Sequence, residues 1–303
     1  MAAKTGSLSI NSENIFPIIK KWLYSDHDIF YRELISNGCD AITKLKKLAL
    51  MGEYEEPGET EYKIQVTVNS EDKTITVEDN GIGMTAEEVE EYINQIAFSG
   101  AQDFLAKYKD KANEDQIIGH FGLGFYSAFM VADKVTIDTL SYKKDAEPVH
   151  WESEGGTEFA MDKGDKEGNG TKIVLYLNED STEFCNEYRA REVIQKYCSF
   201  MPVEIYFVNE EEEEKKAEEA AKKSAEEKVI DVDVKDADTE DGDSEVTLED
   251  EEEEEDDAPK PINQIHPLWT KHPNDCTDEE YKEFYRDVFH DYKEPLFWIH
   301  LNM

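Results

Sequence analysis

The alternation of apolar and polar residues predicts a mixed domain of helices and strands over residues 7–208. Apolar residues recur at helical spacing from Ile29 to Leu45, so we expect a helix that is capped by Asp26 and ends at Gly52. Similar helical patterns occupy residues 86–97, 124–132 and 182–200. Strict alternation predicts half-buried strands at residues 62–68, 74–78, 135–140, 172–177 and 203–208. Because several strands follow one another directly, we expect an α+β, two-layer sandwich with a mostly antiparallel sheet and helices on one face.

The pattern ends in a strongly acidic run. Residues 210–257 contain 26 Asp and Glu against six Lys, which gives this run −20 of the chain's formal charge of −40. Dense like charge with few apolar residues cannot bury enough surface to offset the entropy lost on ordering. We therefore expect an acidic disordered linker at residues 209–259, after a first domain of residues 1–208.

The composition becomes globular again after Pro261. Thr277 and Glu280 have the spacing of a capping box, which predicts the start of a helix. About forty residues are too few to build a core of their own. We expect residues 260–303 to be the truncated start of a second domain in a longer protein.

Composition limits the possible functions. The 303 residues are 39% hydrophobic, enough for a buried core, while the acidic balance argues against non-specific binding to nucleic acid or anionic lipid. The four cysteines form no CxxC pair, so we expect free thiols in a reducing compartment. No signal peptide and no long apolar run is visible, and we expect a soluble, cytoplasmic protein with no membrane partner.

Two glycine-rich motifs are candidates for binding a ligand. The first, Asp79–Met84 (DNGIGM), directly follows a predicted strand, and the second, Gly119–Gly124 (GHFGLG), precedes a predicted helix. Glycines allow backbone N–H groups to approach an anion, although each motif alone also fits an ordinary tight turn. The second motif lacks the Lys-Ser/Thr ending of a Walker loop.

Polar residues on the first long helix form the third candidate. Glu33, Asn37, Asp40 and Lys44 are spaced by four, three and four residues, so they share one face. Taken alone, this face fits a solvated surface with an Asp40–Lys44 pair. The fourth candidate is Gly170–Thr171, which enters a predicted strand and by itself would be a turn.

These four motifs in this order resemble the nucleotide site shared by gyrase, the 90-kilodalton heat-shock chaperones, histidine kinases and mismatch-repair ATPases. The segments YRELISNGCDAITKL, VEDNGIGMT, IGHFGLGFYSAFMVADKV and GTKIVLYL are similar to the chaperone branch. The later segment PLWTKHPNDCTDEEYKEFY resembles the start of that family's middle domain. The resemblance covers nearly the whole chain and implies a Bergerat-type ATP-binding fold for residues 1–208.

The resemblance also implies a role for each matching residue. Glu33 would be the general base that activates water, and Asn37 would offer its amide oxygen to Mg²⁺. Asp79 would accept a hydrogen bond from the adenine amino group, with support from Thr171, while Gly83 and Met84 would lie against the base. Further implied contacts with ATP or ADP involve Asp40, Ala41, Lys44, Ser99, Gly100, Gly119, Phe121, Gly122, Leu123, Gly124 and Phe125. Residues 94–124 would form a mobile lid.

Some positions depart from the family pattern. Gly38 stands in the interior of the first helix, where it should cost roughly 1 kcal/mol, and Cys39 places a thiol near the expected pocket. Tyr92 and Phe98 replace a common Asn and a frequently basic residue, which affects the expected ribose and phosphate contacts.

The resemblance implies an ATP-dependent chaperone that acts on client proteins, with co-chaperones as further candidate partners. The family's catalytic Arg and dimerisation domain lie beyond this sequence, so we expect a mainly monomeric fragment with weak ATPase activity, from a protein that is a homodimer at full length. One alternative is a DNA-acting ATPase of the same superfamily, which the acidic composition disfavours. The other is a module that binds nucleotide without hydrolysing it, which the presence of Glu33 and Asn37 disfavours.

Overall fold

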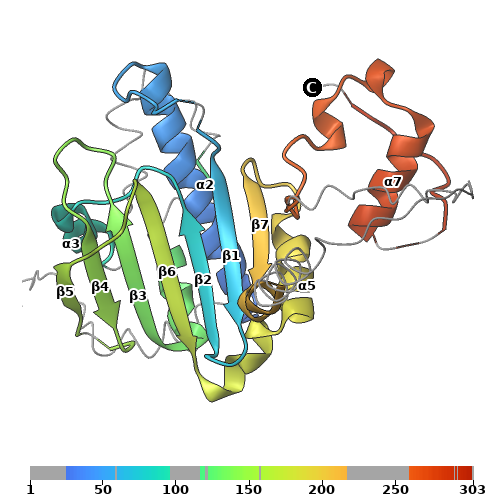
Figure 1. Ribbon diagram of the computed structural model, residues 1–303. Helices are drawn as coiled ribbons and strands as arrows, with labels where there is room; N and C mark the ends of the chain where they lie inside the picture. Colours follow the sequence, from blue (N-terminus) through green and yellow to red (C-terminus); the bar gives the residue numbers. More distant parts are fainter. Residues whose placement is uncertain are drawn as a thin grey trace, which may run out of the picture.

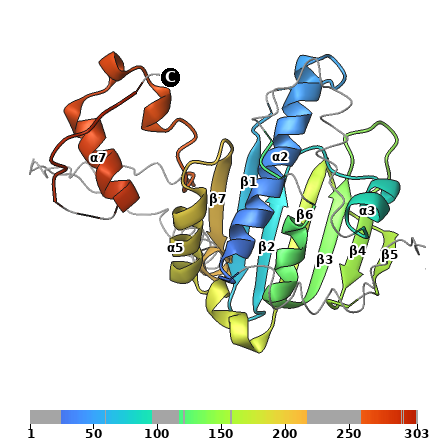
Figure 2. The same cartoon turned by 180° about the vertical axis from the view of Figure 1, so that it is seen from behind.

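The computed structural model of the chain describes residues 25–58, 60–95, 117–119, 122–156, 158–216, 259–289, 291 and 293–301. In these residues a seven-stranded sheet is covered on one face by helices, as Figures 1 and 2 show. This arrangement confirms the predicted α+β sandwich.

The sheet has the strand order β5-β4-β3-β6-β2-β1-β7. All neighbouring strands pair antiparallel except β1 and β7, which are parallel. The strands span Lys63–Asn69 (β1), Thr74–Asp79 (β2), Ala132–Leu140 (β3), Val149–Ser153 (β4), Ala160–Lys163 (β5), Gly170–Leu177 (β6) and Glu204–Asn209 (β7). Five of them match the predicted strands. The sequence pattern missed β4 and β5, which are short and lie at one edge of the sheet, where β5 is largely exposed.

Helix α2 (Ile29–Leu50) lies across the covered face of the sheet. Its apolar side packs into the core with eight buried hydrophobic residues, so the predicted amphipathic helix is confirmed. The predicted cap is wrong, because Asp28 and not Asp26 occupies the N-cap position and its side chain makes no cap hydrogen bond. Instead, the Asp28 carboxylate accepts hydrogen bonds from Lys196 and Tyr197 of a later helix.

Two predicted helices differ in the structure. Residues 124–132 form the 3₁₀ helix η2 (Gly124–Met130), and β3 already begins at Ala132. Residues 182–200 are divided between the 3₁₀ helix η3 (Glu179–Cys185) and helix α5 (Glu187–Cys198). The division lies at Asn186, whose side chain accepts a hydrogen bond from the amide of Arg189 and so caps α5.

Helix α3 (Ala86–Tyr92) begins with a capping box between Thr85 and Glu88. It ends earlier than the predicted helix 86–97, whose last two residues lie outside the described part of the chain.

The core lies between α2, α5 and the covered face of the sheet. It includes Tyr31, whose side chain is fully buried and whose hydroxyl donates to the carbonyl of Phe184. Cys39 is also fully buried, and its neighbour in the core is Cys198 of α5. Burial raises the pKa of the Cys39 thiol far above its usual value, and the negative charges of Asp40 and Asp79 raise it further. We conclude that the Cys39 thiol, which was expected near the pocket, is a buried core residue.

The acidic run begins with ordered structure. Residues 210–216 are helical, which differs from the predicted disorder from residue 209 onward. Glu211 fixes this segment to the turn between β1 and β2, because its carboxylate accepts from the amides of Ser70 (2.7 Å) and Glu71 (2.9 Å). Residues 217–258, most of the predicted linker, lie outside the described residues.

The chain beyond the acidic run rejoins the first domain at the edge strand β7. The amide of Ile262 donates to the carbonyl of Ile205, and the buried Asn263 side chain bonds to the backbone of Met201, Val203 and Ile205. Asn263 therefore fastens the start of residues 260–303 to the edge strand β7 of the first domain.

The remaining C-terminal residues form η4 (Leu268–Thr270), η5 (Pro273–Asp275) and α7 (Asp278–Phe289). The predicted capping box is confirmed, since Thr277 and Glu280 bond reciprocally at the start of α7. Phe200, Trp269 and Phe284 form a small aromatic cluster between this segment and the end of α5. In the described part of the chain, every helix is too short or too polar to cross a membrane.

Candidate functional site

The polar face of α2 meets the second glycine motif. A methyl group at Gly124 would lie 2.8 Å from the Glu33 carboxylate and 3.6 Å from the side-chain amide of Asn37. A methyl group at Gly119 would lie 3.2 Å from the Asp40 carboxylate. The structure thus brings Glu33, Asn37 and Asp40 together with both ends of the Gly119–Gly124 motif, which rules out a freely solvated face.

Asp40 holds the backbone that leads into this motif. Its two carboxylate oxygens accept hydrogen bonds from the amides of Ile118 (2.8 Å) and Gly119 (2.7 Å), and the residue is buried. Its charge also acts on Lys44 one turn later, where it opposes the lowering of the lysine pKa by burial. Asp40 is therefore a structural anchor for the segment beside the polar face.

The first glycine motif forms the other end of the site, where β2 ends. Asp79 is buried and lies opposite Thr171 of β6 in the register of the sheet. One carboxylate oxygen accepts from the amide of Gly81 at 2.8 Å. Burial raises the pKa of Asp79 to about 7, against the opposing effects of the Gly81 amide and the nearby charge of Lys166.

A threonine pair connects the end of β3 with the start of β6 at this position. The hydroxyls of Thr139 and Thr171 lie 3.0 Å apart, and the Thr139 hydroxyl donates to the carbonyl of Gly170. Thr139 also accepts from the amide of Met84, which fixes the last residue of the first motif. Thr139 was not predicted as a site residue, because a threonine inside a predicted strand is ordinary.

Gly83 and Gly170 allow the backbone to cross closely here. Gly83 has φ of 59°, and a methyl group on it would lie 1.8 Å from the carbonyl oxygen of Leu140. Gly170 has φ of 129°, and its methyl group would lie 2.1 Å from the carbonyl oxygen of Asp79. Both positions require glycine on steric grounds, so the protein's own backbone already explains Gly83 without a ligand.

Other sequence-predicted residues are distributed as follows. Ala41 supports the first motif, since its carbonyl accepts from the amide of Ile82. Leu123 precedes η2, and the Phe125 side chain is buried against the ring of Trp151 and contributes to the core. Three predicted residues and one atypical position lie outside the described residues, namely Ser99, Gly100, Phe121 and Phe98.

Two family descriptions match the sequence of the chain. The family described as "Histidine kinase-, DNA gyrase B-, and HSP90-like ATPase" matches residues 31–157, and the family described as "Hsp90 protein" matches residues 183–303. The first of these regions contains three of the four motifs of the site, and the Gly170–Thr171 turn lies between the two regions.

Individual relatives match the chain almost from end to end. The chaperone protein HtpG of Bacteroides thetaiotaomicron is 47% identical over 299 residues, which is 98% of this chain and 38% of the relative. HtpG of Porphyromonas gingivalis is 44% identical over 302 residues, covering 99% and 38% of the two chains. HtpG of Shewanella loihica is 40% identical over 280 residues, covering 92% and 40%. The chain spans about two fifths of the length of these relatives, and it belongs to the Hsp90 family of chaperones.

Proposed function

We propose that this chain is the nucleotide-binding part of an ATP-dependent molecular chaperone, and that it binds ATP or ADP and hydrolyses ATP with Mg²⁺. The observation that carries the proposal is the position of Asp79. Its buried carboxylate lies at the end of β2, opposite Thr171 and at one end of a site whose other end holds Glu33 and Asn37.

The buried carboxylate suits recognition of adenine. An ionised Asp79 can accept a hydrogen bond from the exocyclic amino group of adenine, whereas guanine has a carbonyl oxygen at that place and would be repelled. The Thr139–Thr171 pair offers hydroxyl groups beside the carboxylate. Met84, the last residue of the motif that Asp79 begins, would pack against the base. These groups would select adenine independently of the phosphate contacts.

The residues at the other end suit phosphate chemistry. Glu33 would take a proton from the attacking water, and its carboxylate stands beside Gly124. Asn37 would hold Mg²⁺ through its amide oxygen, and the ion supplies charge neutralisation at the phosphates. Asp40 keeps the backbone before the glycine motif in place, so that amides of the motif can face the phosphates.

For the whole protein we propose the cycle of a chaperone clamp, with client proteins as partners and a homodimer as the working form. Nucleotide binding and hydrolysis would drive the closing and opening of the clamp. The DNA-acting alternative is disfavoured by the formal charge of −40 and by relatives that are chaperones.

Two substitutions in the full-length protein test the proposal. Asp79→Asn places an amide donor toward the adenine amino group, so ADP affinity should fall by at least about 100-fold. Glu33→Ala should retain ADP affinity within about twofold and lower ATP hydrolysis by about 10²–10⁴-fold. Calorimetric titration and a coupled ATPase assay measure the two effects.

The matched control is Asp133→Asn, which removes the charge of an exposed strand aspartate and should change neither quantity. Normal ATP turnover by Glu33→Ala would show that another group is the base. Unchanged ADP binding by Asp79→Asn would show that the nucleotide does not use this carboxylate.

A further inference from the structure

We propose that Asn169 is a positioning residue for adenine recognition, which fixes the Asp79–Gly81 turn from the side of the sheet opposite α2. The inference rests on the proposed function and adds a residue that the motifs of the site do not include. Asn169 lies between Gly168 and Gly170, directly before the strand that carries Thr171.

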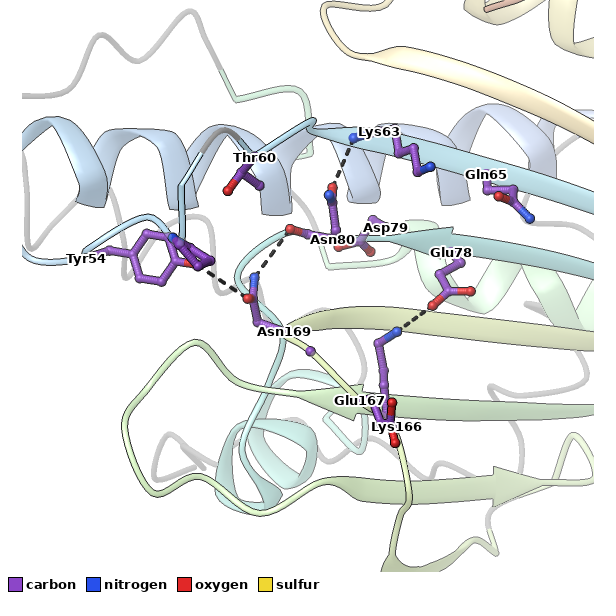
Figure 3. A pocket seen from close by; sticks show the side chains of 12 residues that line it. Tyr54, Thr60, Lys63, Gln65, Glu78, Asp79, Asn80, Lys166, Glu167 and Asn169 are labelled. Carbon is purple, nitrogen blue, oxygen red and sulfur yellow. Dashed lines mark hydrogen bonds and ion pairs between the residues drawn. The ribbon is translucent and has the colours of Figure 1, made fainter. Parts of the chain in front are cut away.

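The side chain of Asn169 bonds to the backbone of the turn. Its amide nitrogen donates to the carbonyl of Gly81 at 2.7 Å and lies 3.4 Å from the carbonyl of Asn80. Its amide oxygen accepts from the hydroxyl of Tyr54, on the loop after α2, at 3.4 Å. Figure 3 shows two of these contacts, with Asn169 between Tyr54 and the backbone at Asn80.

These contacts act on the group that orients Asp79. The amide of Gly81 donates to the Asp79 carboxylate at 2.8 Å. Asn169 bonds to the Asn80 carbonyl, which lies in the same peptide plane as the Gly81 amide, and to the Gly81 carbonyl in the next plane. It therefore restricts rotation of the peptide that carries this amide. Because a hydrogen bond weakens steeply with angle, a rotation of the Gly81 peptide would turn the Asp79 carboxylate away from its preferred orientation.

Tyr54 supports the same turn by a second route. Its ring packs edge-to-face on Tyr142 with centroids 5.9 Å apart, and the amide of Tyr142 donates to the carbonyl of Ile82 at 2.9 Å. One side chain thus braces two residues, Asn169 and Tyr142, that hold successive carbonyls of the first glycine motif. The rest of the turn is held separately, since the Asn80 side chain bonds to the backbone of Glu61 and Lys63.

The position of Asn169 separates it from the nucleotide. Asp79 borders a pocket of about 390 Å³, which Asn169 lines together with Lys63, Gln65 and Glu78. These three residues alternate with the buried residues of β1 and β2, so they point to the open face of the sheet, while Asp79 points to the face that α2 covers. Asn169 therefore acts through the turn and not by contact with the base, which makes it a positioning residue.

The experiment compares two nucleotides in the full-length protein. ADP carries the adenine amino group, and purine riboside 5′-diphosphate carries hydrogen in its place, so only ADP can use the Asp79 contact. Asn169→Ala should weaken ADP binding by about tenfold and the binding of purine riboside 5′-diphosphate by less than about threefold, as measured by calorimetry. The preference for ADP should therefore fall by at least about threefold, while kcat at saturating ATP stays within about twofold.

Further variants separate positioning from general destabilisation. Asn169→Asp retains an acceptor for Tyr54 but loses the donor to Gly81, so it should reduce the preference as much as Asn169→Ala does. Tyr54→Phe keeps the ring and removes the hydroxyl, and it should reduce the preference by less than either Asn169 variant while the protein stays folded. Asn69→Ala is the matched control, because Asn69 also fastens a turn through its side chain, with the amide of Asp72 as donor, at the far end of β1.

Two results would overturn the inference, and they differ. If the unaltered protein prefers ADP but folded Asn169→Ala keeps the same preference, Asn169 does not position the turn and the proposed function survives. If the unaltered protein binds the two nucleotides equally, the assignment of Asp79 to the adenine amino group is itself wrong.

Discussion

The two ends of the candidate site are built in different ways. The proposed adenine end, formed by Asp79, Gly83, Thr139 and Thr171, depends on strand register and on backbone segments in close contact. The proposed phosphate end, formed by Glu33, Asn37 and Asp40, depends on side chains of α2 that reach toward Ile118, Gly119 and Gly124. Backbone contacts inside a sheet cannot move without disturbing the core, whereas side chains can rotate. We therefore expect changes at the adenine end to affect folding and binding, and changes at the phosphate end to affect mainly phosphate contacts and turnover.

The largest effect should come from Gly83→Ala at the adenine end. The new methyl group would lie 1.8 Å from the Leu140 carbonyl, and φ of 59° is itself unfavourable for alanine. Because that carbonyl belongs to β3, the strand or the turn must shift, and we expect a loss of at least about 3 kcal/mol in the free energy of unfolding. Urea denaturation measures this loss.

Gly58→Ala is the control for the backbone angle alone. Gly58 has φ of 75° with open space around the added methyl group, so its loss should be only about 1 kcal/mol. Equal losses for the two variants would show that the close approach to Leu140 does not constrain the adenine end.

The next effect concerns Asp40 at the phosphate end. Asp40→Ala removes the acceptor for the amides of Ile118 and Gly119, and each hydrogen bond to a charged group is worth about 1.5–3 kcal/mol. We expect ATP affinity to fall by about 10- to 100-fold, while the affinity for adenosine, which has no phosphates, changes by less than about threefold. Parallel titrations with the two ligands test this, and an equal loss for both would mean that Asp40 supports the whole site.

Part of this organisation could be predicted from the sequence. Helix α2 and strands β1, β2, β3, β6 and β7 follow long apolar patterns, because each buries one face against the same core. Strand β5 has no such pattern, since an exposed edge strand needs no apolar face. The division of the predicted helix 182–200 depends on one local bond, from the Arg189 amide to the Asn186 side chain, which apolar spacing does not reveal.

The candidate site, like the fold, could be predicted from the sequence only in part. Asp79, Thr171 and the polar face of α2 were found through motifs, and the structure brings them to one region. Thr139 and Asn169 were missed, because their contacts join residues that are far apart in the sequence, 55 positions for Thr139 and Met84 and 88 for Asn169 and Gly81. Such contacts arise from strand register, and the residue types alone are ordinary for a strand and a turn.

The pH dependence of binding should distinguish the two ends. The pKa of Asp79 is raised to about 7 in the nucleotide-free protein, so this carboxyl becomes neutral as the pH falls through 7. Adenine recognition needs the ionised form, and ADP affinity should fall by about five- to tenfold between pH 7.5 and pH 6. Because the pKa of Asp79 is higher in the folded state than in the unfolded state, proton binding to this carboxyl stabilises the folded protein. This contribution to the free energy of unfolding is complete below about pH 4 and is lost as the pH rises through 7.

Calorimetry with ADP and purine riboside 5′-diphosphate at both pH values measures this effect. The second ligand lacks the amino group and should show less than about a twofold change. A parallel decline for both ligands would place the titrating group at the phosphate end.

The smallest effect should come from Gly124→Ala, the counterpart of Gly83→Ala at the phosphate end. The methyl group would lie 2.8 Å from the Glu33 carboxylate, the flexible end of a side chain, and 3.6 Å from the Asn37 amide. Glu33 can rotate away, so we expect the free energy of unfolding to change by less than about 1 kcal/mol and ADP affinity by less than about twofold. Hydrolysis should fall by about three- to tenfold, because the displaced carboxylate is no longer aligned with the attacking water. Gly156→Ala, at a position with nothing closer than 4.0 Å, should leave all three quantities unchanged. A loss of ADP affinity larger than the loss of turnover would mean that Gly124 faces the nucleotide more closely than it faces Glu33, and the phosphate end would then be as sterically fixed as the adenine end.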